Sequence, residues 1–249
     1  MSERWRSGAV LLLSAVIFVV ILLLGPGSEL DALRRVVGIG GDRLGDPADV
    51  EKGGTYAFLQ HQRGSKDEPV TWDPCREIRY EINPDQAPGS DDDAVAFVKE
   101  GIAEVAGITG LRFTYDGTTD RRPDTEGSVR FGRHEPVLIA WATDDEVDEL
   151  SGDVAGVGGA TAQSGDGTEW RWYVTGGVTL DADSFDDLED RRDGEDFQRA
   201  ILLHELGHLV GLDHVDSDRE LMNPDGSGLR DFATGDLNGL VRLGQGDCR

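Results

Sequence analysis

Strands are predicted where polar and apolar residues alternate, or where a short apolar run stands alone. EIRYEIN (77–83) alternates as a half-buried strand does, and LRFTYDG (111–117) predicts a second strand. VLIAWAT (137–143) is an apolar run of strand length, which predicts a central strand. After a glycine-rich stretch (152–167), WRWYVTGGVTLDAD (170–183) predicts a hairpin, or a strand that ends in acidic residues.

Helical spacing of apolar residues predicts three main helices. In residues 90–110 the residues at this spacing are Val95, Val98, Ile102 and Val105. Ser90 or Asp91 caps the start of this helix. FQRAILLHELGHLVGLDH (197–214) predicts a second helix and FATGDLNGLVRLG (232–244) a third. The order of strands and helices predicts an α+β fold with one sheet.

The longest apolar run lies near the N-terminus, in residues 8–25. As a helix it would span roughly 27 Å, close to the hydrocarbon thickness of a bilayer. Arg4 and Arg6 precede it, so a signal anchor would leave a short cytoplasmic tail (1–7) and place the rest of the chain outside. A cleaved signal peptide is the alternative, but the run lacks an A-x-A site. The sequence favours a single-pass protein of the cell membrane over a secreted protein.

The remaining chain is predicted to divide into a linker and one domain. Residues 26–54 show no sustained period and are predicted to be an extracytoplasmic linker. Residues 55–249 are predicted to form one folded domain. Its cysteines, Cys75 and Cys248, would lie outside the cytoplasm, where one disulfide is the simplest prediction.

The charge of the chain limits its partners. The 249 residues include 49 acidic and 24 basic ones, a net charge of −25, which excludes nucleic acid because phosphate binding needs a basic surface. A well-solvated surface is the simplest explanation of the acidity. Structural Ca²⁺ at the acidic runs 144–146 and 181–187, or adaptation to high salt, would also account for it.

HELGHLVGLDH (204–214) contains three of the five histidines. His204 and His208 are four residues apart, so on a helix their imidazoles can approach one ion from the same side. Gly211 suits a sharp turn at the helix end, which would bring His214 to the ion as a third ligand. Three neutral imidazoles suit Zn²⁺ and leave its fourth position open, which is the arrangement of a catalytic site.

Glu205 adds a carboxylate beside these candidate ligands. It would take a proton from a metal-activated water that attacks a carbonyl carbon, and pass it to the leaving amine. The alternatives are a chance cluster of histidines and a zinc site without catalysis. The full spacing argues against the first, and Glu205 argues against the second.

His-Glu-x-x-His-x-x-Gly-x-x-His (204–214) resembles the zinc signature of the metzincin peptidases. LMNP follows, and Met222, eight residues after His214, is similar to the methionine turn of the matrixins, the relatives of the matrix metalloproteinases. Three weaker similarities concern the last matrixin helix, the strand before the zinc helix and the substrate-lining edge strand: DLNGLVRLG (236–244), GGVTLDAD (176–183) and VGGATA (157–162). The resemblance covers about residues 72–245.

The resemblance implies a metzincin fold, with a twisted mixed sheet, a zinc helix above it and a small C-terminal subdomain that carries the methionine turn. It implies a zinc metalloendopeptidase that binds a peptide as an extended strand beside the sheet edge. Met222 would form a floor under the imidazoles. Only His61 and His134 remain for the second, structural zinc of many matrixins, so that site is expected to be absent. Asn223 stands directly after Met222, where members of the family often carry an aromatic residue. The resemblance therefore does not predict the shape of the pocket that binds the side chain after the scissile bond.

Other interpretations stay open at the level of the sequence. Cys75 could act as a thiolate that blocks the zinc instead of forming a disulfide. The protein could be a zinc-binding surface protein without turnover. It could also be a zinc amidase that acts on cell-wall peptides, since the same chemistry would serve.

Overall fold

The computed structural model describes residues 43–123, 129–130, 133–165 and 169–248. Leu44–Asp247 form one compact unit. The predicted tail and apolar segment (1–25) lie outside the described residues, as does most of the predicted linker. The compact unit begins within the segment that the sequence predicts to be a linker.

Membrane attachment is not supported by the described part of the chain. No helix there combines the length and the apolarity needed to cross a bilayer. On this finding the predicted single-pass location in the cell membrane is wrong. The segment 8–25, on which that prediction depended, is not among the described residues.

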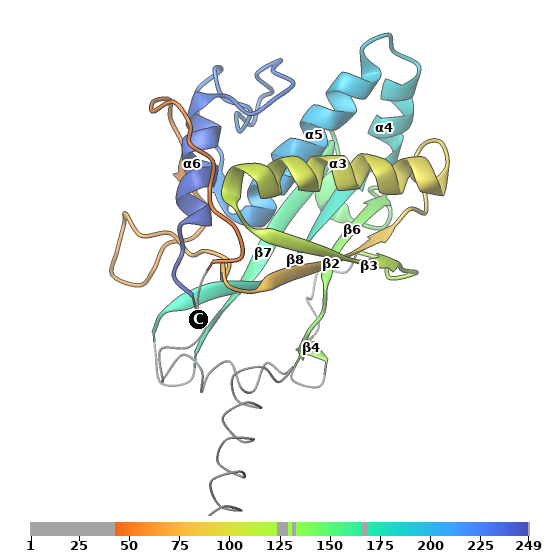
Figure 1. Ribbon diagram of the computed structural model, residues 1–249. Coiled ribbons are helices and arrows are strands. Elements are labelled where there is room, and N and C mark those ends of the chain that lie inside the picture. Colours follow the sequence, from red (N-terminus) through yellow and green to blue (C-terminus); the bar gives the residue numbers. More distant parts are fainter. Residues whose placement is uncertain (1–42, 124–128, 131–132, 166–168, 249) are drawn as a thin grey trace, which may run out of the picture. The chain divides into compact units, whose positions relative to one another are not determined.

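A five-stranded mixed sheet forms the centre of the unit, in the order β3-β2-β6-β8-β7 (Figure 1). Its strands are β2 (Glu77–Asn83), β3 (Arg112–Thr118), β6 (Val137–Ala142), β7 (Gly156–Ser164) and β8 (Arg171–Asp181). The first three and β8 run parallel, whereas β7 pairs antiparallel with β8 and forms one edge. Every residue of β6 is buried because this strand is central, which confirms the prediction from its apolar run.

The described residues form four α-helices: α3 (Asp91–Thr109), α4 (Ala182–Glu189), α5 (Gly194–Val210) and α6 (Thr234–Gly244). The side chain of Ser90 accepts a hydrogen bond from the N–H of Asp93, so of the two predicted caps, Ser90 and Asp91, it is Ser90 that caps α3. α3 packs directly on α5, since a Cβ on Gly101 would lie only 2.7 Å from Cδ2 of Leu202. The predicted α+β fold with one mixed sheet is confirmed.

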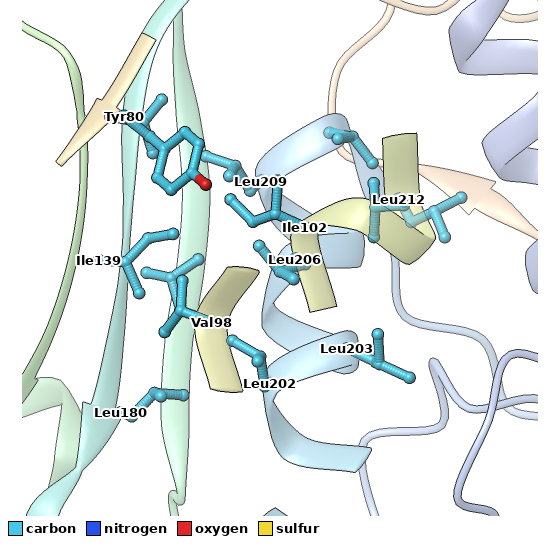
Figure 2. Close-up of a cluster of buried hydrophobic side chains, with 14 of the residues drawn as sticks. Tyr80, Val98, Ile102, Ile139, Leu180, Leu202, Leu203, Leu206, Leu209 and Leu212 are labelled. Carbon is cyan, nitrogen blue, oxygen red and sulfur yellow. The ribbon is translucent and has the colours of Figure 1, made fainter. Parts of the chain in front are cut away.

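The core lies between the sheet and these helices. Figure 2 shows leucines of α5 meeting side chains of α3 and of the central strands. The side chains of this core that are fully or almost fully buried include Val98, Ile102, Ile139, Leu180, Leu202, Leu206 and Leu209. Burying a leucine or isoleucine side chain stabilises a fold by about 1.5–3 kcal/mol, so this cluster holds α5 firmly on the sheet.

The residue pattern did not predict helix α4. It follows β8 at once, and the Asp181 side chain accepts from the N–H of Ser184 to cap it. Its buried apolar residues are Ala182, Phe185 and Leu188. The sequence pattern places Asp181 at the acidic end of a strand, although an aspartate before two apolar residues three apart, here Phe185 and Leu188, is also a helix-start signal.

Short strands complete the unit. β1 (Ala57–Phe58) pairs antiparallel with β9 (Leu212–Asp213), and β4 (Val129–Arg130) pairs with β5 (Arg133–His134). A short 3₁₀ helix, η1, spans Asp148–Leu150.

The segment before β1 is fixed to the domain by backbone hydrogen bonds. The N–H of Leu44 donates to the carbonyl of Pro74 at 3.0 Å, and that of Ala48 to Ile108 at 2.9 Å. These bonds explain why the compact unit begins before the predicted domain boundary.

Neither cysteine is free. Cys75 and Cys248 are both disulfide-bonded. An oxidised Cys75 cannot act as a thiolate, so the alternative in which it blocks the metal is excluded.

Candidate metal centre

Three imidazoles converge at the C-terminal end of α5. His204 and His208 lie one turn apart on this helix, which ends at Val210. Gly211 then reverses the chain with φ 121°, and its N–H donates to the carbonyls of Gly207 and His208 at 3.1 Å each. β9 follows and delivers His214.

Glycine is required at position 211 for two reasons. Its backbone lies in the left-handed region, which side-chain-bearing residues adopt at a cost. A Cβ there would also lie 3.0 Å from the ring of Tyr173 and 3.1 Å from Leu243. The structure therefore places Gly211 at the turn that the sequence assigned to it.

The Nε2 atoms of the three histidines face one another. Nε2 of His214 lies 3.1 Å from that of His204 and 3.0 Å from that of His208. Tetrahedral zinc with bonds of 2.0–2.1 Å separates its ligand nitrogens by about 3.3 Å. Both distances from Nε2 of His214 are thus close to the spacing of zinc ligands.

Backbone carbonyls fix the tautomers of two of these imidazoles. Nδ1 of His204 lies 2.8 Å from the carbonyl oxygen of Leu221, and Nδ1 of His208 lies 2.8 Å from that of Leu212. A carbonyl oxygen only accepts, so each Nδ1 carries the proton and each Nε2 presents a lone pair. A proton on Nε2 of His214 could be donated to only one of the other two Nε2 atoms. A cation among the three nitrogens would satisfy all three lone pairs. The donor set therefore fits a metal ion.

Burial favours the neutral form of the His204 and His208 imidazoles. Desolvation lowers the pKa of His208 to about 4, and the hydrogen bond to the Leu212 carbonyl opposes this only in part. Desolvation also lowers the pKa of His204. Neutral imidazole is the form that binds a metal.

Glu205 lies beside the triad and is 6% exposed. The N–H of Gly158, on the edge strand β7, donates to its carboxylate. Desolvation nevertheless raises the pKa of Glu205 to about 8, because burial disfavours the charged form more than this hydrogen bond favours it. A divalent cation at the neighbouring imidazoles would oppose that rise.

Two glycines of β7 allow α5 to approach this strand. A Cβ on Gly158 would lie 2.3 Å from the backbone oxygen of Glu205. A Cβ on Gly156 would lie 2.8 Å from Cγ of the same residue. The sequence predicts a glycine-rich edge strand here but does not indicate that these glycines belong to the site. A small residue at every second strand position was the available signal.

Met222 is 1% exposed and packs against α5 between the first two histidines. A Cβ on Gly207 would lie only 2.7 Å from its sulfur. The peptide N–H groups of Leu221 and Met222 donate to Asp236 of α6, at 2.6 and 3.3 Å. The sequence did not indicate this role of Asp236 or of the Leu221 carbonyl, because both depend on tertiary contacts.

A cleft of about 790 Å³ opens at the three histidines and Glu205. β7, α5 and the loop after Met222 provide its walls, and among the lining residues are Gly156, Ile201, Pro224 and Leu229. Asn223 also lines it. The cleft gives a substrate access to the imidazoles and to the carboxylate together.

Calcium has no support in the structure. In the part of the chain that is described, none of the acidic residues at 144–146 or 181–187 belongs to a group of three close ligand atoms. The Asp181 carboxylate instead caps α4.

Comparison with known proteins adds a family. The sequence model of the matrixins, a peptidase family, matches residues 71–238. No curated protein matches the chain. The crystal structure of archaemetzincin from Methanopyrus kandleri is similar at 13% identity and a TM-score of 0.37, over 68% of this chain and 94% of that chain.

Proposed function

The chain belongs to the matrixin family of peptidases, and from this premise we propose that it is a zinc-dependent endopeptidase. Metallopeptidase chemistry in general, with a catalytic zinc, is what the family uses. One observation carries the finer proposal: three imidazole nitrogens and the Glu205 carboxylate line the same open cleft.

His204, His208 and His214 would hold the zinc through Nε2. Bound there, zinc would polarise the scissile carbonyl and make a water easier to deprotonate. The Leu221 and Leu212 carbonyls keep the first two rings oriented by accepting from Nδ1. The protein thus supplies a preformed set of three lone pairs.

Glu205 would act as the general base and then as the general acid. Its carboxylate would accept a proton from the attacking water and transfer that proton to the leaving amine. The N–H of Gly158 holds the carboxylate toward the cleft from β7. Burial keeps competing solvent away from it.

The substrate would bind as an extended strand beside β7. Within the described chain, this strand pairs on one side only, with β8, so its other edge is available for main-chain hydrogen bonds. Because Gly158 of the same strand contacts Glu205, a peptide paired there would lie close to the base. Pairing through the backbone requires an unfolded stretch of the substrate.

Cleavage by the full-length protein tests the proposal. Wild-type protein should bind one zinc and cleave casein, a chelator should stop cleavage, and zinc should restore it. Glu205→Gln should keep the zinc and lose about 10²–10⁴-fold in kcat. Glu195→Gln, an exposed glutamate in the first turn of the same helix, is the matched control and should keep its activity.

Other outcomes would change the assignment. Wild-type activity in Glu205→Gln would contradict the proposed role of this residue. Bound zinc with no cleavage of casein or of any unfolded protein would favour a binding protein, and cleavage confined to cell-wall peptides would favour an amidase. Wild-type protein that binds no zinc would overturn the proposal.

A further inference from the structure

Glu220 is a buried carboxylate one residue before the Leu221–Met222 turn. It is 3% exposed and forms no ion pair within the described residues. Leaving water without a cationic partner costs a carboxylate several kcal/mol unless hydrogen bonds replace its hydration. The structure must therefore compensate this group by other means.

Three backbone N–H groups compensate it. Thr55 donates to Oε1 at 3.1 Å, and Gly235 and Asp236 donate to Oε2 at 2.8 and 3.3 Å. The last two belong to the first turn of α6, where the free N–H groups and the helix dipole favour an anion. Glu220 thus joins the N-terminal segment, the turn and α6.

The three segments are packed too closely to move independently. A Cβ on Gly54 would lie 2.1 Å from the N of Gly235, and one on Gly235 would lie 2.2 Å from the carbonyl oxygen of Thr55. Backbone meets backbone here, so neither side can yield by changing a rotamer. A displacement of Glu220 would disturb all of them together.

A second buried carboxylate continues the connection toward the metal centre. Asp236 is 1% exposed and accepts from the N–H of Ala233 at 2.9 Å as well as from those of Leu221 and Met222. The carbonyl of that same Leu221 accepts from Nδ1 of His204. The backbone therefore passes from Glu220 to Leu221, and the carbonyl of Leu221 accepts a hydrogen bond from the candidate zinc ligand His204.

We propose that Glu220 is a positioning residue of the metal centre: its carboxylate fixes the turn so that the Leu221 carbonyl holds His204 in the tautomer that presents Nε2 to the metal. The inference rests on the proposed function for the identity of the metal. It assigns to Glu220 no contact with substrate or ion.

Glu220→Gln tests the assignment in the full-length protein. Both carboxylate oxygens accept N–H groups, so the amide NH₂ of glutamine must face at least one donor. In metal-free protein, ¹⁵N NMR of the imidazoles should show wild-type His204 as the Nδ1–H form and the variant as a mixture of tautomers. Zinc affinity, measured by competition with a chelator, should fall at least about tenfold.

Glu104→Gln is the matched control. Glu104 pairs with Arg199 of α5, and among the described residues no hydrogen bond or ion pair joins it to the turn or to a histidine. This substitution should lower thermal stability without changing the His204 tautomer or the zinc affinity. If Glu220→Gln also leaves both unchanged, Glu220 is a structural residue only and the inference is wrong.

A measurement on wild-type protein covers the case in which Glu220→Gln does not fold. Zinc binding should slow hydrogen exchange at Thr55 and Gly235 more than at Ala48, which donates to Ile108 instead. Equal slowing would contradict the inference. Absence of zinc binding in the wild type would overturn the proposed function, whereas the tautomer of His204 would still decide the role of Glu220.

Discussion

At the residue scale, the site depends on how closely α5 approaches the edge strand. The histidine spacing was readable in the sequence because the ligands lie within eleven residues and follow helix geometry. The contacts of Gly156, Gly158 and Glu220 were not readable, because their partners are 15 to 165 residues away or on another element. Local spacing therefore predicted the ligands, and only the fold reveals what holds them.

Gly158→Ala should destabilise the protein by about 1–3 kcal/mol, the usual range for overpacking. The new Cβ would meet the backbone oxygen of Glu205, which cannot move without α5. Urea denaturation measures the effect. Gly159→Ala is the control, since no atom lies within 4 Å of its Cβ position, and an equal loss in both variants would contradict this explanation.

Glu146 should make stability depend on acid pH. Hydrogen bonds from Arg122 are the main cause that lowers the pKa of Glu146 below its usual 4.5, so the folded state favours the carboxylate. Its contribution is therefore present above about pH 4.5 and is lost as pH falls through the folded pKa. At pH 7 the free energy of unfolding of the wild type should exceed that of Glu146→Gln by roughly 0.2–1 kcal/mol. The difference is small because the Arg122–Glu146 pair is partly exposed. Denaturant unfolding at pH 7 and pH 3 checks this, and a difference that persists at pH 3 would contradict it.

At the element scale, strong periodicity was the part of the fold that the sequence predicted. α3, α5, α6 and strands β2, β3 and β6 lie where their patterns indicate. Helix α4 was not predicted because its eight residues directly follow a strand. Strands β1 and β9 were not predicted because two residues are too few to show an alternation of polar and apolar positions. Their pairing also joins residues more than 150 positions apart.

Two glycines of α3 should respond oppositely to alanine. Gly107 has no atom within 4 Å of its Cβ position, so Gly107→Ala should stabilise the helix by about 0.5–1 kcal/mol. At Gly101 the Cβ would press on Leu202 and Leu206, which are buried, and Gly101→Ala should destabilise by about 1–3 kcal/mol. Thermal unfolding of both variants measures the contrast. Stabilisation in both would mean that the α3–α5 interface adapts.

At the scale of the whole molecule, the candidate metal centre lies where separate parts of the unit meet. α5 supplies two imidazoles, β9 leads to the third, and β1 pairs with β9 from the N-terminal side. The loop after α5 supplies the Leu221 carbonyl. Removal of a metal ion bound there should therefore destabilise the compact unit as a whole.

Removing zinc should lower the melting temperature. A ligand at 100 times its Kd stabilises the folded state by about 2.7 kcal/mol, which for a domain of this size corresponds to roughly 5–10 °C. Calorimetry with and without a chelator measures the shift. Glu205→Gln should retain this shift in melting temperature, and His208→Ala should lose it. If neither variant shows the shift, metal binding at this site is contradicted.

The turn at Gly211 also has a kinetic consequence. It keeps all three imidazoles within one short stretch, so a first approach of the three rings requires only α5 and one chain reversal, and the Leu221 carbonyl and strand β1 complete the arrangement later. Closing so small a loop takes far less time than pairing strands across a hundred residues. Zinc should therefore bind before the transition state and speed refolding while leaving the unfolding rate almost unchanged, which stopped-flow measurements in urea would show as a shift of the folding arm alone.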